Sequence, residues 1–107
     1  MRPAKIRILG KIITIHYVPE GDRLLKDSED DKEPGSGRSD SDKQIIAIED
    51  GQPLESEQDT VLHEVLHIIE DYGAMDIPDG VVQWFATGLL AVLKDNPKFI
   101  SYLRRKK

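Results

Sequence analysis

Apolar residues alternate with polar ones in the first part of the chain and recur at helical spacing in the second. The segments KIRIL and IITIHYV are rich in β-branched residues, which favour strands, and they flank Gly10-Lys11. A glycine at the first central position suits a type II′ turn. The pattern predicts a hairpin with strands near residues 5–9 and 12–18, and a third strand at residues 44–49, QIIAIE.

Most of the stretch between the second and third predicted strands is without aliphatic or aromatic side chains. This part covers residues 26–43, KDSEDDKEPGSGRSDSDK. Such a segment cannot bury apolar surface to offset the entropy that is lost on ordering it. We expect a flexible acidic loop inserted between strands, most simply a surface insertion, with a lid or a partner-binding arm as the alternative.

The second half of the chain predicts two helices and a short third one. Ser56 caps the first, with Asp59 completing a capping-box-like pair, and Gly73 ends it. Pro78 suits the first position of the second helix, which ends at Asn96-Pro97. The apolar stripes expected to be buried are Leu62, Val65, Leu66, Ile69 and Tyr72 on the first helix, and Val81, Val82, Phe85, Leu89, Leu90 and Leu93 on the second; KFISYL, residues 98–103, adds the short C-terminal helix.

Length and element order together predict the fold class. Three strands followed by helices indicate an α+β fold, and 107 residues suffice for one domain with one core, residues 1–107. We expect a small three-stranded sheet packed on two antiparallel helices.

Composition narrows the possible functions. No apolar run approaches the roughly 18 residues of a membrane span, and the N-terminus lacks the features of a signal peptide, so we expect a cytoplasmic protein without a membrane partner. The net charge of −5 argues against nucleic acid as a partner. The chain has no cysteine, so a bound metal ion must be held by histidine, carboxylate or water.

The strongest chemical signal is HEVLH, residues 63–67, within the first predicted helix. Residues four apart lie on the same helical face, so His63 and His67 project side by side and their imidazoles can bind one zinc ion. Glu64 lies about 100° further around the helix, where it can take a proton from a water molecule. This arrangement is the H-E-x-x-H motif, which provides two metal ligands and a general base. The alternative is a polar edge of an amphipathic helix with no bound metal.

A third protein ligand is needed for a catalytic zinc site. Asp79 at the start of the second helix is favoured, because a carboxylate neutralises charge; an acid interacting with the helix dipole is the alternative interpretation. Gln83 remains a candidate, since it lies more nearly level with His67 in an antiparallel pair. Glu70, seven residues beyond His63, could reach the ion only without His63. Glu70 and Asp71 are therefore given a supporting role at most, with a solvated helix end as an equal alternative.

The segment LHEVLHIIE followed by VVQWFATGLLAVLKDNP resembles the small phage-encoded zincin-like metallopeptidases, which are similar to the ImmA/IrrE-type group. The resemblance covers roughly residues 44–97. It rests on H-E-x-x-H and on an A-N-x-F-A-x-x-L-L stretch, matched here at Phe85, Ala86, Leu89 and Leu90. The A-N pair is missing, and Asp79 stands where the group usually has a longer glutamate.

The resemblance implies a zincin-like fold with an edge strand beside the active-site helix. It implies zinc bound by His63, His67 and Asp79, with Glu64 as catalytic base, in a peptidase that cleaves intracellular protein, often a regulator. The substrate is then expected to pair along the edge formed by QIIAIE. Tyr72 and His16 are imaginable donors to the oxyanion, but a structural role is favoured for each. The alternative function is a non-catalytic zinc-binding or interaction module in which the site is structural.

Overall fold

The computed structural model describes residues 1–26 and 35–106, which form an α+β fold. A four-stranded mixed sheet contains β1 (Lys5–Ile8), β2 (Lys11–Val18), β3 (Gly37–Asp40) and β4 (Ile45–Glu49), in the spatial order β1-β2-β4-β3. Strands β2 and β4 are parallel, and the two outer pairs are antiparallel. The fold class is as predicted, but the sheet has four strands rather than three.

The first hairpin differs from the prediction in its turn. Ile8 pairs with Lys11, so Leu9 and Gly10 are the two central residues, and both have positive φ, 49° and 84°. Two positive φ values define a type I′ turn, and the predicted type II′ turn at Gly10-Lys11 is therefore wrong. The right-handed twist of the paired strands favours either type, and the position of one glycine does not separate them.

The additional strand lies inside the segment predicted to be a flexible loop. Residues 37–40 pair with 45–48 across a four-residue connection in which Gln44 has a φ of +57°. The Lys43 amide donates to Asp40 Oδ1 at 3.1 Å and so fixes this turn. The prediction of a loop over residues 26–43 is wrong for β3, because main-chain hydrogen bonds to β4 hold a strand that has no apolar side chain. The part of that prediction at 27–34 lies outside the described residues.

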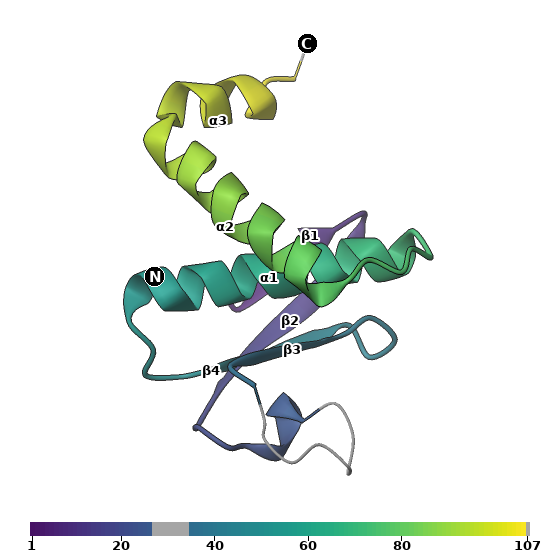
Figure 1. Cartoon of the computed structure of the whole chain (residues 1–107). Coiled ribbons are helices and arrows are strands. Elements are labelled where there is room, and N and C mark those ends of the chain that lie inside the picture. The colour runs from purple at the N-terminus through teal and green to yellow at the C-terminus, as the bar shows by residue number, and fades with distance from the viewer. Residues whose placement is uncertain (27–34, 107) are drawn as a thin grey trace.

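Strand β4 is consequently an interior strand, and the sheet edge next to the helices is β3 (Figure 1). Ile46, Ala47 and Ile48 are all buried, as expected of a strand covered on both faces. The edge predicted at QIIAIE is thus wrong, because β3 occupies it. On the side of β4 away from the helices, Ala47 packs with Val18 and with Leu25 of the short 3₁₀ helix η1 (Arg23–Leu25).

Three helices follow the sheet: α1 (Leu54–Tyr72), α2 (Asp79–Asp95) and α3 (Pro97–Arg104). Helix α1 begins two residues before the predicted cap, after Pro53, and no side chain caps it. Ser56 lies inside its first turn, where its carbonyl oxygen accepts from the Thr60 hydroxyl at 2.8 Å. Pro78 is the residue that precedes α2 rather than its first helical residue. The helix boundaries therefore follow the prolines rather than the serine.

The main core lies between α1 and the sheet (Figure 1). Ile68 of α1 is fully buried against strand residues, with Val61, Val65 and Tyr72 beside it. The predicted stripe is wrong at Ile69, which is 41% exposed, and it omitted Ile68. The strand residues of this core are Ile8, Ile13, Ile15, Ile46 and Ile48.

Helix α2 crosses α1 diagonally and then leaves it, and α3 turns away at its end (Figure 1). Only Val82 and Ala86 of α2 are buried. The predicted burial of its other apolar residues is wrong for Val81, Phe85 and Leu89, which are 42%, 63% and 39% exposed. No helix in the part of the chain that the structure describes is both long and apolar enough to span a membrane.

Candidate metal centre and its pocket

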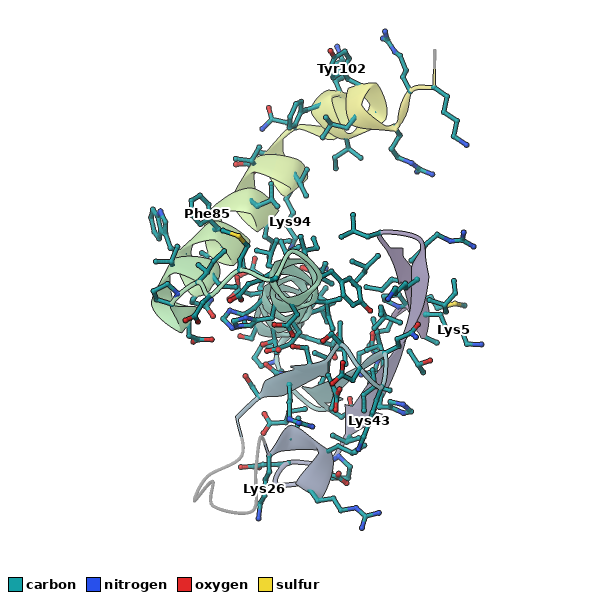
Figure 2. The ribbon with its side chains drawn as sticks, turned by 90° about the vertical axis from the view of Figure 1, so that its right-hand side faces the viewer. Lys5, Lys26, Lys43, Phe85, Lys94 and Tyr102 are labelled. Carbon is teal, nitrogen blue, oxygen red and sulfur yellow. The ribbon has the colours of Figure 1, made fainter. Side chains whose placement is uncertain are left out.

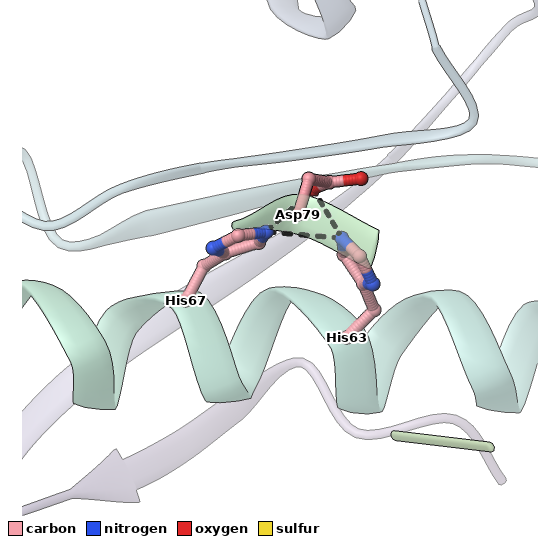
Figure 3. A group of neighbouring side chains, drawn as sticks. All are labelled: His63, His67 and Asp79. Carbon is pink, nitrogen blue, oxygen red and sulfur yellow. Dashed lines mark hydrogen bonds and ion pairs between the residues drawn. The ribbon is translucent and has the colours of Figure 1, made fainter. Parts of the chain in front are cut away.

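The imidazoles of His63 and His67 converge on the carboxylate of Asp79 (Figure 3). Asp79 Oδ1 lies 3.0 Å from His63 Nε2 and 2.9 Å from His67 Nε2, and the two nitrogens are 3.0 Å apart. Ligands about 2.0–2.2 Å from one ion lie roughly 3 Å from each other. The three side chains could therefore hold one metal ion without a change of backbone.

Each ligand owes its position to a local feature of the chain. The helical repeat of α1 places His63 and His67 one turn apart on the side that faces α2. Asp79 begins α2 directly after Pro78, which starts the helix where it meets α1. Asp79 is 77% exposed at its side chain, whereas His63 is 10% exposed, so the group is open to solvent on the Asp79 side.

A carboxylate outside the group fixes the orientation of His67. Glu70 Oε1 lies 2.8 Å from His67 Nδ1, and Glu70 Oε2 accepts from the Ile77 amide at 2.7 Å. Both bonds lower the pKa of Glu70, the amide bond contributing most, so Glu70 is ionised and His67 Nδ1 must be the donor. The Nε2 atom of neutral His67 then carries a lone pair directed toward Asp79.

A positive charge is therefore required between His67 and Asp79. Two lone pairs 2.9 Å apart repel each other unless a proton or a metal ion lies between them. Burial lowers the pKa of His67, but the hydrogen bonds to Asp79 and Glu70 outweigh it and raise the pKa above its usual 6.5. The bond to His67 likewise lowers the pKa of Asp79. A metal ion bound here would displace any proton carried by His67 Nε2.

His63 completes the group differently. Its Nδ1 atom is buried and has no hydrogen-bond partner within residues 1–26 and 35–106. Histidines that bind metals usually donate from their second nitrogen to an oxygen. His63 thus lacks the support that Glu70 gives His67, and of the two imidazoles that of His67 is held more firmly.

Glu64 lies on a different side of α1, against β3. It is only 6% exposed, and burial raises the pKa of its carboxyl, against the opposing effects of the two histidines and of a Ser39 hydrogen bond. A carboxyl with a raised pKa beside a group of metal ligands is suited to accept and return a proton near neutral pH.

Gly37 allows β3 to lie directly against this part of α1. A Cβ atom at Gly37 would be 2.5 Å from Thr60 Cγ2 and 3.2 Å from Glu64 Oε2. A side chain there would force the strand and helix apart. The close approach brings the backbone of the edge strand beside the Glu64 carboxylate.

A pocket of about 450 Å³ connects these features. Residues 35–39 line one side of it, and residues of α1 and α2 line the other. The edge strand, the proposed base and the candidate metal ligands therefore share one open cleft, whose lining residues from the helices are Thr60, His63, Glu64, His67, Asp71, Asp79 and Gln83.

The other candidates from the sequence lie elsewhere or are already bonded. Gln83 lines the pocket but donates to Asp59 Oδ2 at 2.7 Å and to Thr87 at 3.1 Å, away from the histidines. Tyr72 packs on the core and donates to the Ser41 carbonyl at 3.4 Å, and His16 lies on β2, paired with Ala47. Neither Tyr72 nor His16 is among the lining residues of the pocket.

Sequence reasoning missed the contribution of β3, namely Gly37, Arg38 and Ser39. The available signal was the polar run SDKQ directly before a strong strand, which suits a hairpin turn. A hairpin there would have placed residues 37–40 beside β4.

No protein-family model, curated protein or solved structure matches the chain. The functional argument therefore depends on the geometry of the site and on the sequence motif.

Proposed function

We propose that the protein is a zinc-dependent metallopeptidase in which Glu64 is the general base. The observation that supports this most is the placement of a buried carboxyl in the same cleft as three converging metal ligands and a strand edge. A metal site alone would not require the carboxyl, and a peptide-binding edge alone would not require the ligands. The resemblance of the H-E-x-x-H segment to zincin-like peptidases agrees with this proposal.

Two histidines and one carboxylate are a ligand set that suits zinc. A bound zinc ion supplies Lewis acidity, which polarises a carbonyl group and makes a water ligand more acidic. His63, His67 and Asp79 would hold the ion, and Glu70 keeps His67 in the tautomer that presents Nε2.

Glu64 performs the proton transfers in this proposal. Its carboxylate takes a proton from the attacking water and later gives it to the amine that leaves. Burial raises the pKa of Glu64, which brings proton acceptance and release closer in free energy at neutral pH. A hydrogen bond from Ser39 of β3 opposes the effect of burial and ties the carboxyl to the edge strand.

The substrate class follows from β3. Among the strands of residues 1–26 and 35–106, β3 pairs with β4 alone, and an extended peptide could pair with the other edge of the Gly37–Asp40 backbone. Such a peptide would add a strand to the sheet and run past Glu64 and the ligands. Main-chain pairing of this kind selects for extended conformation rather than for particular side chains.

The alternative is a non-catalytic zinc-binding module. Structural zinc sites are normally closed by four protein ligands. Within residues 1–26 and 35–106 the structure brings together three, and the Asp79 side is open to solvent. An open position favours catalysis over a structural role.

The test is a cleavage screen on a whole proteome, comparing the zinc-loaded parent with zinc-loaded Glu64→Gln. Glutamine keeps the size of the side chain but cannot accept the proton. We expect Glu64→Gln to keep its zinc and thermal stability while cleavage falls roughly 10²–10⁴-fold. If the zinc-loaded parent cuts no peptide that the variant spares, the protein is not a peptidase, and the non-catalytic zinc-binding module is the better description.

A further inference from the structure

The apolar stripe of helix α2 is wider than the part of it that the fold covers. Val82 and Ala86 are buried against α1. On the outer side, Val81, Phe85 and Val92 are 42%, 63% and 45% exposed. The apolar stripe of an amphipathic helix is normally covered over its whole width.

The outer residues follow a helix-packing pattern. Val81, Phe85, Gly88 and Val92 are spaced by four, three and four residues, the spacing of a seam between paired helices. Gly88 lies near the middle of α2, and a Cβ atom there would have nothing within 4 Å. A small residue at the centre of a seam lets another helix approach closely.

Further exposed apolar residues lie around this outer seam and on α3. Figure 2 labels Phe85 on α2 and Tyr102 on α3. A pocket of about 360 Å³ between the C-terminal end of α1 and the start of α2 adjoins Val81 and Phe85 and is lined mainly by apolar side chains. The other exposed apolar residues of this region are Ile69, Met75, Trp84, Leu89, Phe99, Tyr102 and Leu103.

The summed exposed area of these residues is in the range of a stable interface. The ten large apolar residues of the outer seam, its surroundings and α3 are between 39% and 72% exposed. With full areas of about 200 Å² each, they leave on the order of 1,000 Å² in solvent. Apolar patches on monomers rarely exceed about 600 Å², whereas a standard interface buries about 800 Å² on each partner.

The charges on the chain favour a second copy as the occupant. The exposed Asp76 lies just before α2, and Lys94 stands in its last turn. Residues 94–107 carry six basic groups and one acidic group, a net charge of +5. Because the whole chain has a net charge of −5, residues 1–93 have a net charge of −10. Antiparallel packing of two α2 helices would place the acidic start of each beside the basic end of the other.

We propose that the protein forms a homodimer with two-fold symmetry, in which the α2 helices cross antiparallel at Gly88. A two-fold interface uses the same surface on both copies, so a seam centred on a glycine and flanked by opposite charges is self-complementary. Phe85 of each copy packs against Val92 of the other, and each α3 extends toward the partner's apolar pocket. This proposal does not depend on the peptidase function.

The direct test is a disulfide at the two-fold axis. The chain has no cysteine, so Gly88→Cys introduces the only thiol. Two copies of residue 88 meet at the crossing, and we expect mild oxidation at micromolar concentration to link most chains as dimers. Leu9→Cys is the control, because Leu9 is 69% exposed but lies on the β1–β2 turn. Equal linking of the two variants would overturn the proposal.

A second test avoids oxidation. The mass of the parent in solution should be twice 12.1 kDa by light scattering at about 50 µM. Val92→Glu and Phe85→Glu should give folded monomers, while Leu9→Glu should remain a dimer. A monomeric parent, a parent that forms larger open assemblies, or a dimer that survives Val92→Glu would each contradict the proposal. The circular dichroism spectrum of Val92→Glu should match that of the parent, which would show that the variant is a folded monomer and not an unfolded chain.

Discussion

Helix α1 buries polar groups, whereas α2 exposes large apolar ones. Glu57, His63 and Glu64 of α1 are 6–8% exposed, and Trp84 and Phe85 of α2 are 72% and 63% exposed. Each helix reverses the usual distribution, and each reversal has a cost in free energy that the isolated domain does not explain. In α1 the buried polar groups serve the proposed site, except Glu57, which pairs with Arg2 at 3.0 Å. In α2 the exposed apolar groups serve the proposed interface.

The largest expected effect is on the free energy of unfolding, to which buried residues of α1 should contribute much more than exposed residues of α2. Ile68 of α1 is fully buried, and Ile68→Ala should lower the free energy of unfolding by about 2–5 kcal/mol. Trp84→Ala should cost less than about 0.5 kcal/mol in dilute protein, because the side chain is mostly in solvent. Urea unfolding at several protein concentrations measures both. The cost of Trp84→Ala should grow with concentration, and a constant cost would contradict the account of α2.

The next effect concerns the metal ligand that α2 contributes to α1. Asp79→Asn keeps the shape of the side chain but removes its charge. Loss of a residue that hydrogen-bonds to a metal ligand weakens metal binding roughly 10–100-fold, and loss of the ligand's own charge should weaken zinc binding by more than this. Zinc titration against a competing chelator measures this. Gln83→Ala is the control, since Gln83 is bonded to Asp59 and Thr87. If both variants bind zinc as the parent does, Asp79 is only a helix-start acid.

A smaller effect is expected from the carboxylate that orients His67. Glu70 accepts two hydrogen bonds on separate oxygens, from His67 Nδ1 and from the Ile77 amide. Glutamine has only one side-chain oxygen, so in Glu70→Gln the new NH₂ group would face one of these two N–H donors. Zinc affinity should fall about 10–100-fold. Asp71→Asn removes a negative charge from the next residue, which lines the pocket, and it should change the affinity less. Equal losses would mean that only net charge matters.

The smallest change is a pH dependence. Protonated His67 cannot bind metal, and its hydrogen bonds to Asp79 and Glu70 raise its pKa above 6.5. Zinc affinity should therefore be highest above that raised pKa and should begin to fall before the pH reaches 6.5, by about tenfold per pH unit for one displaced proton. Titrations at several pH values test this. A fall that begins only below pH 6.5 would show that the His67 pKa is not raised.

The sequence was sufficient for features that depend on hydrophobic pattern or helical spacing. The α+β class, the N-terminal hairpin and the helix that carries His63, Glu64 and His67 all follow from such patterns. The juxtaposition of Asp79 with the histidines was one of several open alternatives, because spacing within a helix says nothing of how two helices cross.

Other features depend on contacts that hydropathy does not record. Strand β3 is held by main-chain bonds to β4, and Gly37 matters because of its distance from Thr60 and Glu64. The exposure of Phe85 was missed because an apolar helix face predicts burial without saying whether the covering surface belongs to the same chain.

The most direct measurement is the zinc content of the purified protein after zinc exchange and dialysis, compared with the His63→Ala/His67→Ala double variant. The parent should retain about one equivalent per chain and the double variant almost none, with the sheet and helices unchanged by circular dichroism. Retention of zinc by the double variant at the level of the parent, or its absence from both, would contradict a metal centre at His63, His67 and Asp79.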